Sequence, residues 1–183
     1  MDINALMSTM LSGDSIESMS RVAGVSQEQV KSVLGSALPQ MLDGAKGQAT
    51  DEATAEGFAN ALSDHAKADT SDVKGFLTGV DQIDGGKILA HLLGGGLNAT
   101  TQTAASSSGL KPAQAAQILA IAAPLLMSLL GQQAGQESGN NASGIGGLMS
   151  AFLGKTDTAK LIQLLLFGKK KKKGRLGLLL GGK

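Results

Sequence analysis

The chain of 183 residues contains no cysteine, no tryptophan and no tyrosine, and only three prolines. The absence of cysteine excludes disulfide bonds, thiolate metal sites and cysteine nucleophiles. Because aromatic residues are limited to four phenylalanines, the core must consist mainly of Leu, Ala, Ile, Val and Met. Apolar residues make up 42% of the chain, which suits one domain or two small halves that share a core.

A secretory signal is also missing from the start of the sequence. Met1-Asp2 leads into a mixed polar and apolar segment, without a basic start or a continuous apolar stretch. We therefore expect a cytoplasmic protein.

Charge is distributed unevenly, although the net charge is only +1. Residues 1–64 contain nine acidic and three basic residues, whereas residues 155–183 contain nine basic residues and one acidic residue. This distribution indicates an acidic body with a basic C-terminal tail.

The chain resembles itself when it is shifted by 85 residues. Residues 24–49 (GVSQEQVKSVLGSALPQMLDGAKGQA) align with residues 109–134 (GLKPAQAAQILAIAAPLLMSLLGQQA), with Gly24 over Gly109 and Pro39 over Pro124. The motif ILAHLLGG at 88–95 also matches RLGLLLGG at 175–182. We interpret the chain as two helical pseudo-repeats of about 85 residues, followed by a stub that opens a third copy.

The hydrophobic pattern predicts an all-α fold, since no stretch alternates as a strand between hairpin turns. Helices are expected over 3–11, 14–23, 26–46, 51–67, 71–78, 84–93, 98–107, 112–131, 143–153, 157–167 and 174–180. Ser26 with Gln29 forms a capping box, and Pro112 suits the first helical position. We expect N-terminal caps at Asp14, Asp51 and Asp157, and glycine C-terminal caps at Gly13, Gly47, Gly94, Gly131, Gly154, Gly168 and Gly181.

Residues 118–130 (ILAIAAPLLMSLL) are apolar on every side of the expected helix. Such a helix lies either in a protein core or in a membrane. A spanning helix needs about 20 apolar residues, so we predict a core helix. Pro39 and Pro124 fall within the two long helices, where each removes a hydrogen bond and predicts a kink or break.

Residues 20–35 (SRVAGVSQEQVKSVLG) are similar to the turn and second helix of a helix-turn-helix DNA-binding motif. The exposed face would offer Ser26, Gln27, Lys31 and Ser32, with Glu28 beside them in an acidic half of the chain. Phosphate contacts supply most non-specific DNA affinity, and this surface would repel phosphate. The helix is also too long for a recognition helix, so DNA binding here is the least favoured interpretation.

Other motifs do not indicate an enzyme. Residues 147–156 (GLMSAFLGKT) have Met149 where a phosphate-binding loop needs glycine, and 81–87 (DQIDGGK) lack the ligand spacing of a calcium loop. We expect His65 to be solvated and His91 to lie near a helix C-terminus. Neither histidine has a nucleophile or metal ligand at a telling spacing, so we expect no catalytic residues, no metal, no cofactor and no small-molecule substrate.

The tail places five consecutive lysines between two apolar segments. A solvated charged loop is one interpretation of this run. Contact with an anionic membrane or nucleic acid is another, through Lys169, Lys170, Lys171, Lys172, Lys173 and Arg175. The stub lacks the helices that follow it in each repeat, so it must pack on its own repeat or on another molecule. Self-association would then use Leu176, Leu178, Leu179 and Leu180.

Three segments together resemble the bacterial YidB-like family of domains of unknown function. They are GVSQEQVKSVLGSALPQML, DGGKILAHLLGGG with His91, and SGLKPAQAAQILAIAAPLLMSLLG, and the resemblance covers residues 1–155. It implies a compact, all-helical, cytoplasmic bacterial protein, with no known activity to carry over. The lysine run and the stub depart from the pattern of the family.

The sequence thus predicts one all-α domain over 1–168, with pseudo-repeats at about 1–87 and 88–168 and a lysine-rich tail with a stub at 169–183. The favoured function is that of a non-enzymatic interaction or scaffolding protein that forms homo-oligomers. A peripheral module that binds membrane or nucleic acid through its lysines is the alternative, and a helix-turn-helix regulator is third.

Overall fold

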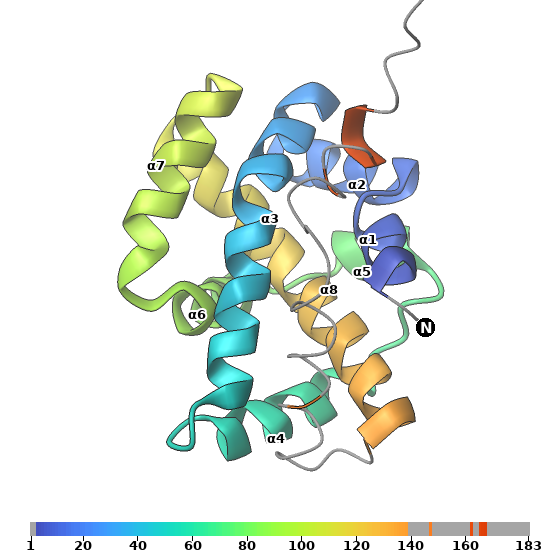
Figure 1. Cartoon of the computed structure of the whole chain (residues 1–183). Coiled ribbons are helices and arrows are strands. Elements are labelled where there is room, and N and C mark those ends of the chain that lie inside the picture. Colours follow the sequence, from blue (N-terminus) through green and yellow to red (C-terminus); the bar gives the residue numbers. More distant parts are fainter. Residues whose placement is uncertain (1–2, 139–146, 148–161, 163–164, 168–183) are drawn as a thin grey trace, which may run out of the picture.

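A computed structural model describes residues 3–138, 147, 162 and 165–167 (Figure 1). The described part of the chain is helical and contains no β-strand, which confirms the all-α prediction. Its elements are α1 (Ile3–Met10), α2 (Gly13–Ala23), α3 (Gln27–Thr50), α4 (Ala55–His65), α5 (Val73–Thr78), α6 (Gln82–Leu93), the 3-10 turn η1 (Gly94–Gly96), α7 (Leu97–Ser108) and α8 (Pro112–Ser138). The tail at 169–183, and the helices expected over 143–153 and 174–180 apart from residue 147, lie outside the described residues.

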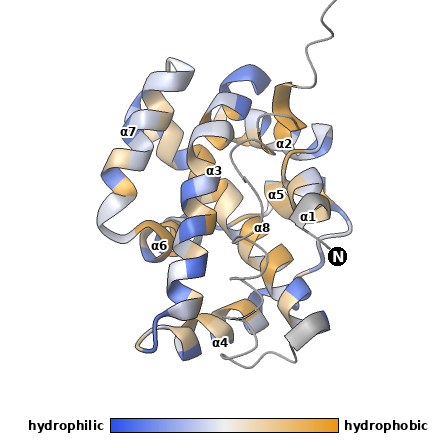
Figure 2. Ribbon diagram, viewed as in Figure 1, coloured by the Kyte–Doolittle hydropathy of each residue, from blue (hydrophilic) through white to orange (hydrophobic). Residues whose placement is uncertain are grey.

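Helix α8 forms the centre of the fold, and each of the other seven α-helices in the described residues contacts it. Apolar residues concentrate on α8 and on the helix faces turned towards it, while polar residues lie along the outer side of α3 (Figure 2). Residues 118–130 are all buried, as expected for a core helix. By length and composition α8 could cross a membrane over Pro112–Gln136, but 78% of that apolar window is buried inside the fold.

Local hydrogen bonds explain where two of the helices begin. The Gln29 backbone N–H donates to Ser26 Oγ at 3.2 Å, and the Ser26 N–H donates to Gln29 Oε1 at 3.0 Å. This confirms the predicted capping box at the start of α3. Pro112 is the first residue of α8, where its missing N–H has no helical partner to lose.

Several predicted caps are wrong. Of the expected glycine caps in the described residues, only Gly94 ends a helix; Gly13 begins α2, whereas Gly47 and Gly131 lie inside α3 and α8. The two long helices continue past these glycines because Ala49 and Ala134 are still buried in the core. Tertiary burial therefore outweighs the low helix propensity of glycine.

The expected aspartate caps differ as well. Ser12 caps α2 by accepting from the Ser15 N–H at 3.1 Å, and Asp14 lies in the first turn. Asp51 ends α3 instead of starting α4. Its carboxylate accepts from the Ala53 N–H at 2.9 Å, which stabilises the turn between the two helices. Asp157, Gly154, Gly168 and Gly181 lie outside the described residues.

Residues that the 85-residue shift aligns have similar local structure. Gly24 and Gly109 end α2 and α7 with φ of +67° and +68°, a left-handed conformation that favours glycine. Pro39 and Pro124 both lie inside continuous helices, so neither proline breaks its helix. The interpretation of the chain as two pseudo-repeats remains a prediction.

Residues 165–167 form a helical segment that contacts the N-terminal half of the chain. A methyl group at Gly35 of α3 would press on Leu166 Cδ1, and Leu166 and Ile162 are both buried. Leu165 and Phe167 on either side of Leu166 expose 38% and 55% of their surface. The segment therefore buries one apolar face and presents another to solvent.

Candidate functional site

The residues that the sequence selects as contacts all lie outside the described residues. These are the basic group and the apolar group of the tail: Lys169, Lys170, Lys171, Lys172, Lys173 and Arg175, and Leu176, Leu178, Leu179 and Leu180. The helix-turn-helix candidate is described and does not support DNA binding. Lys31 pairs with Glu28 at 2.7 Å, Arg21 pairs with Glu17 at 2.8 Å, and α3 has 24 residues, which is longer than a recognition helix needs.

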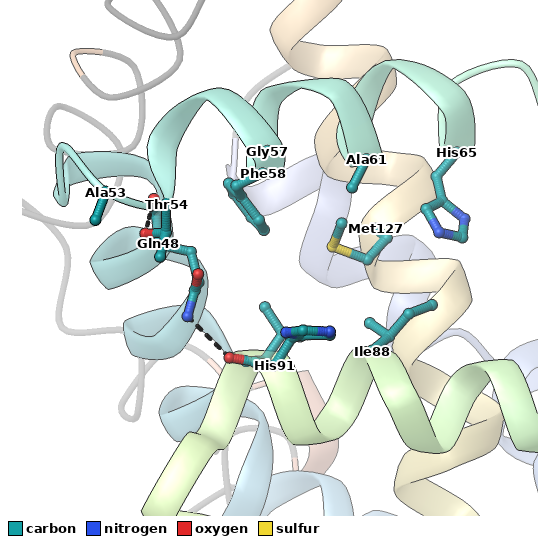
Figure 3. A pocket seen from close by; sticks show the side chains of 11 residues that line it. Gln48, Ala53, Thr54, Gly57, Phe58, Ala61, His65, Ile88, His91 and Met127 are labelled. Carbon is teal, nitrogen blue, oxygen red and sulfur yellow. Dashed lines mark hydrogen bonds between the residues drawn. The ribbon is translucent and has the colours of Figure 1, made fainter.

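A pocket of about 350 Å³ lies between the C-terminal part of α3, α4, α6 and α8 (Figure 3). This volume is at the lower end of the usual range for ligand pockets. The apolar side chains of its lining are Ala53, Phe58, Ala61, Ile88, Leu92 and Met127. The polar side chains of its lining are Gln48, Thr54, His65 and His91.

Glycines fix the helices around this pocket at short separations. A methyl group at Gly44 of α3 would overlap the backbone carbonyl of Leu92 in α6, and one at Gly131 of α8 would overlap that of Leu62 in α4. Gly85 of α6 is equally close to the carbonyl of Ala120 in α8. Three of the helix–helix contacts around the pocket, α3 with α6, α8 with α4 and α6 with α8, therefore depend on the absence of a side chain at a glycine.

Two hydrogen bonds join the polar edge of the pocket. Gln48 Nε2 donates to the carbonyl oxygen of His91 at 2.9 Å, and this bond connects α3 to the last turn of α6. Thr54 Oγ1 donates to the carbonyl oxygen of Gln48 at 2.9 Å and holds the start of α4 against α3. Figure 3 shows the first of these bonds at the side of the pocket where His91 lies.

Both histidines of the chain line this one pocket, from opposite walls. His65 is the last residue of α4 and is half-buried, whereas His91 in α6 is exposed. Their rings lie on either side of Met127 in Figure 3. His91 lies in the last turn of α6 as expected, but the sequence interpretation of His65 as solvated missed its partial burial.

The sequence contains a pattern that indicates this site, although neither histidine has a nucleophile or metal ligand at a characteristic spacing. Phe58, Ala61 and His65 follow one another by three and four residues, so they share one face of α4. Ile88 and His91 share a face of α6 in the same way. A search for histidines that continue an apolar stripe would have selected both residues, although it could not have shown that the stripes meet.

Apart from the two imidazoles, the side chains that line the pocket carry no ionisable group. Asp64 adjoins His65 in sequence, but it pairs with Lys67 at 2.8 Å. The hydrogen bond and charge of Lys67, with a smaller contribution from His65, lower the pKa of Asp64. Within the described residues, no three His, Cys, Asp or Glu side chains are grouped to hold a metal ion.

Residues 5–133 match the family model described as a bacterial protein of unknown function (DUF937). The chain belongs to this family. The match confirms the resemblance to YidB-like proteins that the sequence motifs indicate. No curated protein and no solved structure matches the chain significantly.

The DUF937 region contains the entire lining of the pocket, from Gln48 to Met127. It ends within α8, before the segment at 165–167 and the lysine run. The pocket is therefore part of the matched region, whereas the basic and apolar tail lies outside it.

Proposed function

We propose that this DUF937 protein is a non-enzymatic helical interaction protein that self-associates through its C-terminal segment. The observation that supports this most directly is the exposure of Leu165 and Phe167 beside the buried Leu166. A second copy of the chain would cover these large apolar side chains at the surface, and the sequence adds further apolar residues at 176–180.

A role outside catalysis is supported by the surroundings of the two histidines. Apolar side chains lie beside both rings in the pocket. The hydroxyl of Thr54, which shares the pocket, donates to a backbone carbonyl and not to an imidazole. A general base next to an activated nucleophile, as nucleophilic catalysis requires, is therefore not assembled there.

Light scattering behind size exclusion tests self-association. The full chain should have a larger mass than a monomer, and a chain that ends at Gly168 should be monomeric. Within the full chain, Leu178→Asp with Leu179→Asp should also give monomers. Lys171→Gln with Lys172→Gln changes the net charge by the same amount, keeps the leucines and should leave the assembly intact. A monomeric full chain at high concentration would refute the proposal.

Binding to an anionic membrane is the second candidate, supported by the position of Phe167. This exposed aromatic side chain lies two residues before Lys169, the first of five lysines. Each lysine near an anionic membrane contributes about 1 kcal/mol, and a neighbouring apolar side chain adds to the contact by insertion.

Vesicle sedimentation tests this candidate. The protein should sediment with vesicles that contain phosphatidylserine and not with vesicles of phosphatidylcholine alone. Replacing lysines 169–173 with glutamine should abolish the difference, and added salt should weaken it. Equal binding to both kinds of vesicle would refute the electrostatic contact. Salt-sensitive binding to duplex DNA without vesicle binding would indicate nucleic acid as the anionic partner instead.

A further inference from the structure

The interior of the pocket between α3, α4, α6 and α8 suits an apolar chain. Phe58 of α4, Ile88 and Leu92 of α6, and Met127 of α8 are buried side chains of its lining. With about 30 Å³ for each water-sized group, a volume of about 350 Å³ holds roughly ten non-hydrogen atoms. An occupant of this size is a small molecule rather than a helix of a partner protein.

The edge of the same pocket suits a negative charge. His65 and His91 are the ionisable side chains of the lining, and no carboxylate accompanies them. Neither imidazole makes a hydrogen bond to the residues that the structure describes, so their N–H groups are free to donate to a ligand. An imidazole N–H donates a hydrogen bond, and a carboxylate accepts stronger hydrogen bonds than a neutral oxygen does.

The acidic side chain that adjoins His65 in the sequence does not cancel this preference. Asp64 is exposed and holds Lys67 in an ion pair. Gln48 is also constrained, because its amide donates to the carbonyl of His91 and holds the end of α6 in place. The rim therefore presents two imidazoles beside an apolar interior.

We propose that this pocket binds a small amphiphilic carboxylate. The apolar chain lies against Met127, and the carboxylate accepts hydrogen bonds from His65 and His91. The site is distinct from the C-terminal segment, so this proposal holds whether or not the protein self-associates.

Three probes of equal chain length and different head groups test the proposal by titration calorimetry. Octanoate, 1-octanol and octylamine are each titrated into the full chain in the same buffer. Octanoate should bind about tenfold more tightly than octanol, because its carboxylate accepts charge-assisted hydrogen bonds. Octylamine should bind more weakly than octanol. Equal affinities for all three probes, or no binding of octanoate, would overturn the proposal.

Imidazole NMR signals of the unmodified protein give a second measurement that depends on no variant. The chain has two histidines, so every imidazole signal belongs to His65 or His91. Octanoate should shift the signals of both residues, and octanol should shift them less. Shifts confined to residues outside the pocket would overturn the assignment of the site.

Substitutions then distinguish the contribution of the ligand's head group to affinity from that of its alkyl chain. His65→Gln with His91→Gln should reduce octanoate affinity about tenfold and leave octanol affinity unchanged. Ala61→Leu, which fills the pocket, should lower the affinity for both octanoate and octanol. The same change at the exposed Ala99 of α7 should leave both affinities unchanged. Unchanged octanoate affinity in the histidine variant would contradict the proposal, provided that its thermal unfolding matches that of the unmodified protein.

Discussion

Neighbouring glycines in α6 provide a sharp test of the packing that frames the pocket. A methyl group at Gly85 would overlap the carbonyl oxygen of Ala120 in α8, whereas one at Gly86 meets no atom within 4 Å. The two positions share the same helix and the same intrinsic propensity. Alanine substitutions at the two sites therefore differ only in what the added carbon meets.

The structure gives opposite signs for the two substitutions. Gly86→Ala should stabilise the protein by about 0.5–1 kcal/mol, because alanine loses less backbone entropy in a helix than glycine does. Gly85→Ala has the same favourable effect on backbone entropy. However, its methyl group must push α6 away from α8 at a backbone contact, and such overpacking costs about 1–3 kcal/mol. Gly85→Ala should therefore be about 1–3 kcal/mol less stable than Gly86→Ala.

Urea unfolding followed by circular dichroism measures this difference, since the chain has no tryptophan or tyrosine for fluorescence. The slope of the free energy of unfolding against urea should be equal in both variants, so that a shift of the midpoint reports stability alone. If Gly85→Ala unfolds at the same urea concentration as Gly86→Ala, or at a higher one, the close approach of α6 to α8 is refuted.

In α3, Gly44→Ala should destabilise the protein and Gly47→Ala should stabilise it, because of the two glycines only Gly44 lies against a backbone carbonyl. The midpoints of urea unfolding measure both effects. Ser26→Ala should lower the free energy of unfolding by about 1 kcal/mol through loss of the capping box. Asp14, first through its hydrogen bond and then through its charge, raises the pKa of Lys74 above that of an ordinary lysine. Lys74→Met should therefore lower Tm at neutral pH, and the deficit should vanish as the pH rises through the raised pKa.

The sequence predicted those features of the fold that depend on local chemistry. The capping box at Ser26, the proline that opens α8 and the buried run at 118–130 each follow from a few neighbouring residues. The ends of the long helices could not be predicted from neighbouring residues, because glycine favours the end of a helix unless a partner helix packs against it. Gly131 stays helical because Leu62, far away in the sequence, packs against it.

The pocket could be predicted only in part, for a related reason. The apolar stripes that end at His65 and His91 are visible in the sequence, but their meeting depends on how closely α6 approaches α3 and α8. That approach is set by Gly44 and Gly85 against backbone carbonyls of other helices. Such contacts join residues that no short-range pattern relates, so the site emerges only from the packed structure.

The central position of α8 has a consequence for how the protein is made. Because α8 contacts every other α-helix in the described part of the chain and extends to Ser138, the preceding helices leave the ribosome before the one helix that they all contact. Domains otherwise begin to fold from the N-terminus during synthesis. Here the apolar faces of α1 to α7 that pack on α8 stay uncovered until α8 emerges, so this domain should complete its folding late in its synthesis.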